Sequence, residues 1–401
     1  MMRENTPPRK DDDDDDVIFE DADEVYEVDD IDDLEEMLDS EGAFGDDDGD
    51  DNDDDDDDKE DEFPATEVDK ILFSGHQGSV FCCEISPCED IGASGGEDDK
   101  AFLFDSKTGN ILAQCEGHKD SVTNLSFSHN GMYLATGDMS GYIAVWKVQT
   151  FGKVWEFETD DLNWMIWHPS SNILFAGTRT GDIWMWLMPR GDTRPLTHAG
   201  VSSECGALTR DGKRLCSGFV DGSIKIIDLK NCKTLHSISC HSQPVTSLSA
   251  HPQHDLILSG SMDETSKLLN SNSGKVLSTF TFTPSSSQNS ESNSNDDEFS
   301  NSVEVVSFCP IIADLATSRH HIVQGCGTSS ILWHPKEPHF ISCGLDGNLR
   351  VYDVRSGNQL YKFKGDNSSV LSCHINKEGS KVIFSSDKGT VTVLNIGSLY
   401  S

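Results

Sequence analysis

A repeat of about forty residues organises most of this chain. The unit GHKDSVTNLSFSHNGMYLATGDMSGYIAVWKV begins at Gly117, and the preceding unit, GHQGSVFCCEISPCEDIGASGGEDDKAFLFD, begins at Gly75 and matches it element by element. Each unit has a Gly-His turn and short runs of β-branched and aromatic residues, separated by turns rich in Gly, Asp and Asn. Because a single unit cannot bury its own apolar face, such units have to pack against one another. The repeat therefore predicts an all-β fold made of many similar small sheets.

The period is that of WD40 repeats, which form the blades of a β-propeller. His76 and His118 lie 42 positions apart, and later units carry the landmarks WMIWHPSSNILFAGTRTGDIWMW, DGKRLCSGFVDGSIKIIDL, CHSQPVTSLSAHPQHDLILSGSMDE, ISCGLDGNLRVYDVRSGN and VLSCHINKEGSKVIFSSDKGTVTVLNI. If one short unit is counted, these make eight. The sequence predicts an eight-bladed WD40 β-propeller over residues 65–401, with a seven-bladed ring as the alternative.

The sixth unit is too short for a complete blade. Its strand VEVVSFCP is followed by IADLAT, which has the character of a last strand, with no middle strand and turn between them. Roughly fifteen residues are absent by the repeat period, so either this blade is degenerate or the sequence lacks an exon. The Ser/Asn-rich stretch at about 283–301 precedes it and is predicted to be a disordered loop.

The last unit supplies only three strands before Ser401. The segment TEVDKILF, at residues 66–73, is predicted to supply the fourth. Pairing the first strand with the last blade closes the ring and removes exposed strand edges.

Residues 1–64 form a strongly acidic tail. Up to Glu62 there are 34 acidic and 4 basic residues, which account for −30 of the formal charge of −41. With so few apolar residues the tail is predicted to be disordered. Its field repels nucleic acid and attracts basic partners, so we expect a basic protein client and no direct nucleic-acid binding.

The chain has no feature of a secreted or membrane protein. It begins MMRENTPPRKDDDDDD, without the apolar region of a signal peptide, and no run of about eighteen apolar residues occurs. We expect a soluble monomer in the cytoplasm, with the nucleus as a second location open to it. The twelve cysteines show no CxxC pairs, so we expect reduced core residues, no metal and no cofactor.

Several units contain a His, a Ser or Thr, an Asp and a Trp at the offsets of the hydrogen-bonded network that stabilises a WD40 blade. The predicted network residues are His76, Ser94, Asp98, His118, Thr136, Trp146, His241, Ser259 and Asp263. A Ser-His-Asp set also suggests a nucleophile, but catalytic sites do not recur blade by blade. No P-loop, HExxH or GxSxG motif occurs either, so we expect no catalytic residue and no enzyme.

Acidic residues also gather in the turns that a propeller presents on one face. The candidate partner-binding residues are Glu97, Asp98, Asp99, Asp120, Asp138, Asp160 and Asp161, with Trp164 as a candidate apolar anchor. A basic segment would bind such a face. The alternative is that these carboxylates only stabilise tight turns, which Asp does by bonding its own backbone.

Longer motifs behind the acidic tail narrow the family. The strings GGEDDKAF, GHKDSVT, ATGDMSG, WMxWHP, AGT-x-x-GD-x-WMW and CGLDG-x-LRVYD-x-RSG resemble the angio-associated migratory cell protein family over roughly residues 70–400. The resemblance implies an eight-bladed propeller, and its motifs include Glu97, Asp98, Asp99, Lys100, Asp120, Asp138, Trp164 and Trp167. The family is similar to a fungal ribosome-assembly factor that escorts a basic large-subunit ribosomal protein, whereas its animal members are linked to cell migration and angiogenesis.

These observations predict a non-enzymatic, protein-binding propeller. The first hypothesis is a chaperone or assembly factor for a basic ribosomal protein of the large subunit. The alternative is a WD-repeat signalling scaffold linked to cell migration and angiogenesis.

Overall fold

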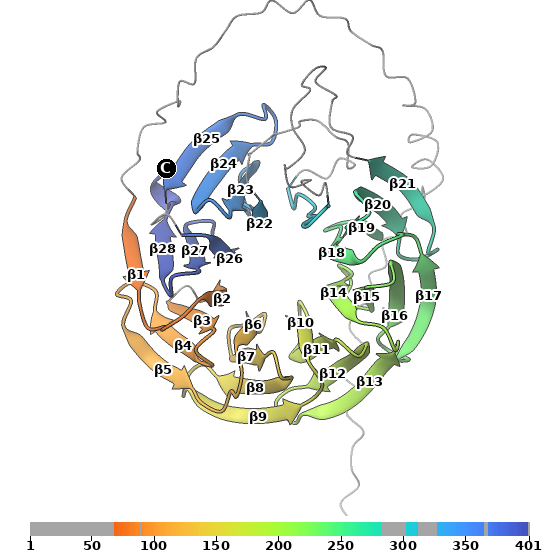
Figure 1. Cartoon of the computed structure of the whole chain (residues 1–401), viewed down its shortest axis with the longest axis horizontal. Coiled ribbons are helices and arrows are strands. Elements are labelled where there is room, and N and C mark those ends of the chain that lie inside the picture. The colour runs from red at the N-terminus through yellow and green to blue at the C-terminus, as the bar shows by residue number, and fades with distance from the viewer. Residues whose placement is uncertain (1–67, 89, 282–301, 312–326, 365–367, 400–401) are drawn as a thin grey trace, which may run out of the picture. The chain divides into compact units, whose positions relative to one another are not determined.

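Seven four-stranded antiparallel sheets are arranged in a ring (Figure 1). The computed structural model describes residues 68–88, 90–281, 302–311, 327–364 and 368–399. The predicted tail at 1–64 and the predicted loop at about 283–301 lie outside these residues. Within the described part of the chain, no helix is long and apolar enough to cross a membrane.

Each of six sheets follows the chain from an inner strand near the ring axis to an outer strand (Figure 1). The first three sheets are β2 (Val80–Ile85), β3 (Ile91–Gly96), β4 (Ala101–Asp105) and β5 (Ile111–Cys115); β6 (Val122–Phe127), β7 (Tyr133–Asp138), β8 (Tyr142–Lys147) and β9 (Gly152–Glu158); and β10 (Leu162–Trp167), β11 (Ile173–Thr178), β12 (Asp182–Leu187) and β13 (Asp192–His198). The next three are β14 (Ser203–Leu208), β15 (Arg214–Phe219), β16 (Ser223–Asp228) and β17 (Lys233–Ser239); β18 (Val245–Ala250), β19 (Leu256–Ser261), β20 (Thr265–Asn270) and β21 (Val276–Thr281); and β22 (Thr328–Trp333), β23 (His339–Gly344), β24 (Asn348–Asp353) and β25 (Gln359–Lys364).

The last sheet combines both ends of the repeat region. It consists of β26 (Val370–Ile375), β27 (Lys381–Ser386), β28 (Val391–Asn395) and β1 (Lys70–Phe73), and a short 3-10 turn at Gly397–Leu399 follows it. β1 pairs antiparallel with β28, from Lys70 opposite Leu394 to Phe73 opposite Val391. The predicted closing strand within residues 66–73 is therefore confirmed.

Burial explains the sequence of each strand. The middle strands are covered on both faces, so β7, with the sequence YLATGD, is buried throughout, whereas the outer strand β9 alternates between half-buried and exposed residues. Close packing between sheets requires glycine in the second strand. A Cβ on Gly95 would lie 2.5 Å from Cγ1 of Val122 in the next sheet, and one on Gly218 would lie 2.6 Å from Cγ1 of Val245.

The prediction of eight blades, with the sixth degenerate, is wrong for the described residues, which form the seven blades of the alternative. Residues 302–311 nevertheless lie where the inner strand of the sixth blade is expected. A Cβ on Gly260 would lie 2.8 Å from Cγ1 of Val303, as in the other sheets, and the Val303 N–H donates to the Ser261 carbonyl at 3.0 Å. The Phe308 ring packs edge-on against His251. No described strand pairs with this segment.

The short repeat also affects the sheet that follows it. Each of the other six inner strands begins with a buried residue, such as Val245 or Val370, but β22 is only half-buried along its whole length. Thr328, at its start, is in the position that packs against the second strand of the preceding blade. The residues that follow the inner strand of that blade, 312–326, lie outside the described part of the chain.

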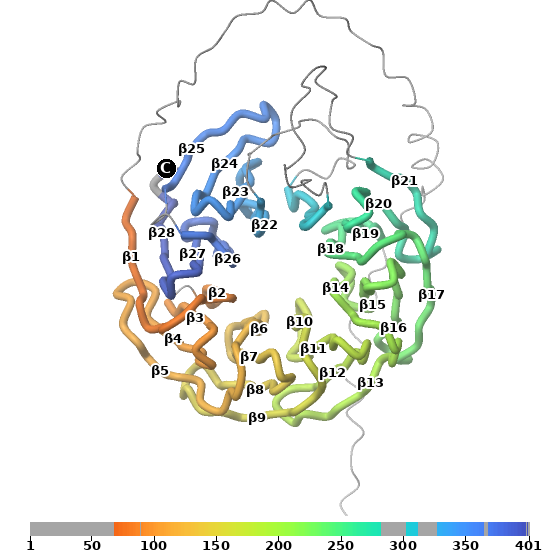
Figure 2. The backbone as a smooth tube through the Cα atoms, in the orientation of Figure 1, coloured from red at the N-terminus to blue at the C-terminus, as the bar shows by residue number. Residues whose placement is uncertain are grey.

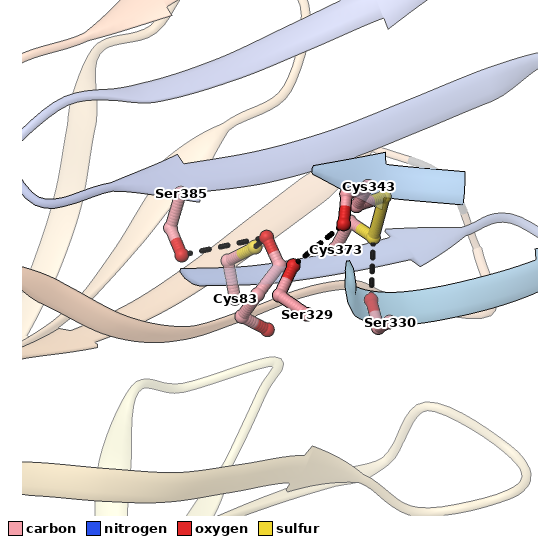
Figure 3. The surroundings of a disulfide bond; sticks show 7 residues. Cys83, Ser329, Ser330, Cys343, Cys373 and Ser385 are labelled. Carbon is pink, nitrogen blue, oxygen red and sulfur yellow. Dashed lines mark hydrogen bonds between the residues drawn. A yellow bond between two sulfur atoms is a disulfide. The ribbon is translucent and has the colours of Figure 1, made fainter. Parts of the chain in front are cut away.

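One pair of cysteines is bonded. Cys343 in β23 and Cys373 in β26 form a disulfide that joins neighbouring sheets, beside Ser330 (Figure 3). The prediction that all cysteines are reduced is wrong for this pair, because packing places two distant chain positions side by side. Nine other described cysteines are free, and burial raises the pKa of the Cys83 thiol to about 12, which makes it unreactive.

Candidate functional site

The turns between the second and third strands all lie on one face of the ring. In every sheet, the first residue after the second strand donates its N–H to the carbonyl of the residue before an inner strand, at 2.8–3.2 Å. We call these seven residues the rim positions: Glu97, Met139, Arg179, Val220, Met262, Leu345 and Asp387. All seven are exposed. The face that these turns share with the loops leading into the inner strands is called the turn face.

Five of the predicted partner-binding residues are exposed on the turn face. These are Glu97, Asp99, Asp120, Asp160 and Asp161. Local bonds hold several of them: Glu97 accepts the Ser79 N–H at 3.0 Å, and Asp160 accepts the Thr180 hydroxyl at 3.1 Å. They come from three consecutive sheets, those of β2–β5, β6–β9 and β10–β13.

Asp387 is an exposed acidic residue that the sequence reasoning missed. It occupies the rim position of the last sheet, next to the sheet that carries Glu97. Alignment of SSDKG with the GGEDDK turn of the first sheet would have identified it. With Asp387, four consecutive sheets contribute carboxylates to the turn face.

Three of the predicted partner-binding residues point inward. Asp138 is fully buried and Asp98 nearly so, and each accepts a hydrogen bond from a buried histidine. The Trp164 side chain is buried between sheets, where its indole N–H donates to the Ser203 hydroxyl at 2.8 Å. A Cβ on Gly177 or on Gly206 would collide with this indole. We therefore assign Asp98, Asp138 and Trp164 to the framework of the face and not to its contact surface.

The hydrogen-bonded networks hold the turns in place. His76 Nδ1 lies 2.8 Å from Asp98 Oδ1, and its Nε2 lies 2.9 Å from the Ser94 hydroxyl. His241 makes the corresponding contacts with Asp263 and Ser259. The carboxylates also accept backbone N–H groups, such as that of Gln77 at Asp98. Each network thus ties the loop before an inner strand to the turn after the second strand.

The second sheet forms the same network with a shifted carboxylate. His118 lies 2.8 Å from the Thr136 hydroxyl, which also accepts the Trp146 indole N–H at 2.9 Å. The third partner of His118 is Asp138, at 3.2 Å, two positions before the residue that aligns with Asp98. Ser140, at the aligned position, donates to Asp138.

Electrostatics in these networks favours neutral histidine beside ionised aspartate. Burial lowers the pKa of His76 and of His241, and it outweighs the opposing effect of the neighbouring carboxylates. Burial raises the pKa of Asp263, but hydrogen bonds from Thr265, the Ser242 N–H and His241 together outweigh it and hold the pKa at about 2. Because Ser94 and Ser259 are fully buried, no substrate can reach their hydroxyls. The arrangement is that of a structural network.

No group of His, Cys, Asp or Glu side chains in the described residues is arranged to hold a metal ion. The chemistry that the turn face offers is therefore that of exposed carboxylates and apolar side chains on a rigid support.

Comparisons with known proteins agree with this description. The family described as "WD domain, G-beta repeat" matches residues 68–105, 109–147, 232–270 and 315–353, and the "Anaphase-promoting complex subunit 4 WD40 domain" family matches 165–249. Among solved structures, Sqt1 from Chaetomium thermophilum superposes with a TM-score of 0.68 at 20% identity, covering 82% of this chain and 99% of that one. The computationally designed Ika8 protein gives 0.65 at 21% identity, covering 81% and 99%.

Sequence relatives are more specific. The angio-associated migratory cell protein of Homo sapiens is 38% identical over 337 residues, which cover 79% of this chain and 77% of the relative. The corresponding protein of Canis lupus familiaris is 37% identical over the same lengths. The match extends over most of both chains, so this chain belongs to the angio-associated migratory cell protein family of WD-repeat proteins.

Proposed function

We propose that this propeller is a chaperone or assembly factor that holds a basic segment of a client protein on its turn face. The observation that carries the proposal is the set of exposed carboxylates on four consecutive sheets: Asp387, Glu97, Asp99, Asp120, Asp160 and Asp161. A flexible, extended segment rich in Lys and Arg fits this series of carboxylates, because its positive side chains can pair with the carboxylates of one sheet after another.

The acidic tail supports the same proposal through the sign of its charge. It adds −30 to a propeller region that is itself acidic, so the whole chain attracts basic proteins and speeds their association. It also repels RNA, with which a free basic client would otherwise associate.

The family resemblance suggests the identity of the client, a newly made large-subunit ribosomal protein. Such a protein travels from the cytoplasm to the nucleus, which are the two compartments that we propose for this chain. A monomer suffices, because one ring presents the whole arc of carboxylates.

Reversing four exposed carboxylates tests the proposal. In the variant Glu97→Lys, Asp120→Lys, Asp160→Lys, Asp387→Lys, affinity for a basic client is expected to fall by roughly ten- to a hundredfold, because exposed charge pairs contribute ~0.2–1 kcal/mol each. The measurement is quantitative mass spectrometry of proteins that co-purify with the tagged full-length chain, at low and at moderate salt. Wild type should retain one dominant, basic, salt-sensitive protein.

A matched control reverses four exposed carboxylates in the turns between first and second strands, at the opposite edge of the sheets: Asp90→Lys, Asp255→Lys, Glu337→Lys, Glu378→Lys. It changes the net charge equally, so it should retain the client if position matters. If both variants lose the client to the same extent, net charge alone drives binding and the turn face is not the site. A broad, salt-tolerant set of partners with wild type would support a signalling scaffold instead.

A further inference from the structure

The seven rim positions differ sharply in chemistry around the ring. Glu97 and Asp387 are acidic and Arg179 is basic, but Met139, Val220, Met262 and Leu345 are apolar, and between 41% and 50% of each of these four is exposed. Single exposed apolar residues are common on protein surfaces. Here, however, four of them occupy one structurally equivalent position, each fixed by the same backbone hydrogen bond.

Three of these residues follow one another around the ring. Val220 belongs to the sheet of β14–β17, Met262 to that of β18–β21, and Leu345 to that of β22–β25. We call these three the apolar arc. Between the last two of these sheets the structure describes residues 302–311 and Gly327, and the Val303 N–H bonds the residue just before Met262. Figure 2 shows that β14–β21 lie across the ring axis from β2–β5, which carry Glu97, whereas β22–β25 are separated from β2–β5 by the last sheet.

We call the four sheets that carry Asp387, Glu97, Asp120 and Asp160 the acidic side of the turn face, and the three sheets of the apolar arc the apolar side. Exposed carboxylates also lie in the turns of the apolar side, at Asp221, Glu264 and Asp346, so what distinguishes this side is its unbroken run of apolar rim positions.

Exposed ion pairs alone bind weakly, and tight protein–peptide binding depends on a few buried apolar or aromatic side chains. On the acidic side Trp164 is buried between sheets, and Met139 is the one apolar rim position. Methionine is flexible and polarizable, which suits contact with an aromatic ring. Val220, Met262 and Leu345 supply three exposed apolar side chains on consecutive sheets.

We infer that the apolar arc binds the apolar, preferably aromatic, side chains of the same client segment whose basic residues lie over the acidic side. The inference rests on the proposed function and deepens it. The client segment is a run of Lys or Arg followed by bulky apolar residues, long enough to cross the ring axis. The charge of the acidic side selects this partner over an acidic or neutral apolar segment.

Two labelled peptides test the inference on the full-length chain. One is an arginine-rich peptide ending in two phenylalanines, and the other carries serines in their place with the same charge. Fluorescence anisotropy should show that wild type binds the phenylalanine peptide about tenfold more tightly, as expected for partial burial of two aromatic side chains. In Val220→Ser, Met262→Ser, Leu345→Ser the two peptides should bind equally, and the salt dependence should match that of wild type.

The control variant carries Met132→Ser, Val154→Ser and Leu235→Ser, at residues that are 40–47% exposed and lie away from the turn face. It should keep the tenfold preference. If wild type binds both peptides equally while the charge-reversed variant binds neither, the proposed function is supported and the inference about the apolar arc is refuted. If wild type binds neither peptide, the proposed function fails together with this inference. A preference that survives in the Val220, Met262, Leu345 variant places the anchor elsewhere.

Discussion

Replacing Phe73 with alanine lowers the free energy of unfolding by about 3–5 kcal/mol, the range for removal of a buried aromatic side chain. Only 2% of Phe73 is exposed, and its ring stacks on Phe104 with centroids 4.3 Å apart. Its backbone, by contrast, pairs with Val391 of the last sheet. One residue thus joins the first and last sheets. Urea unfolding followed by circular dichroism measures the loss.

The neighbouring Leu72 is the matched control. It lies in the same strand, pairs with Thr392 and is 52% exposed. Leu72→Ala should therefore change stability by less than about 1 kcal/mol. Equal losses in the two variants would mean that β1 contributes only its backbone pairing, and that the aromatic contact between the first and last sheets adds nothing.

The closing strand illustrates what the sequence alone can predict. The last repeat unit of the chain supplies only three strands and needs a fourth, and KILF has the composition of a strand. The pairing of β1 with β28 therefore follows from counting the strands of the last unit. The number of blades does not follow in the same way. The sequence shows that the sixth unit is short, but only the packing of Val303 against Gly260 shows which strand position remains.

The site was harder to predict because neighbouring residues in a turn point in different directions. Asp98 and Asp99 are adjacent in sequence, but Asp98 bonds His76 whereas Asp99, with φ of 59°, faces solvent. The sequence places several carboxylates at this turn but does not show which of them is exposed. The Cys343–Cys373 bond is beyond sequence reasoning for a related reason, because it joins different strands of neighbouring sheets.

Glu84, in the inner strand β2, is a largely buried carboxyl, with 17% of its side chain exposed, whose titration should be visible in the stability of the protein. Burial raises its pKa to about 8, against the opposing effect of the Phe127 N–H, which donates to Oε2 at 2.9 Å. Oε1 lies 3.7 Å from Nε2 of His374, and burial lowers the pKa of that histidine to about 4. Near neutral pH both groups are therefore uncharged in the folded protein.

The sign of the effect follows from proton counting. Between pH 4.5 and 8 the folded protein holds a proton on Glu84 that the unfolded chain has lost, so the free energy of unfolding falls as pH rises, by at most about 1.4 kcal/mol per unit. His374 acts in the opposite sense between about pH 4 and 6.5, where only the unfolded chain binds its proton. Above pH 6.5 the effect of Glu84 stands alone.

Glu84→Gln should remove this pH dependence while keeping an acceptor for the Phe127 N–H. Between pH 6.5 and 8, wild type is expected to lose about 1–2 kcal/mol of stability relative to the variant. Urea unfolding of both proteins across this pH range measures the difference between their free energies of unfolding. The effects of all other titrating groups cancel in this difference, because the two proteins share them. Parallel curves would show that Glu84 is ionised in the folded ring. The 3.7 Å contact would then join an ionised Glu84 carboxylate to His374, and the inner strands would be more hydrated than their burial indicates.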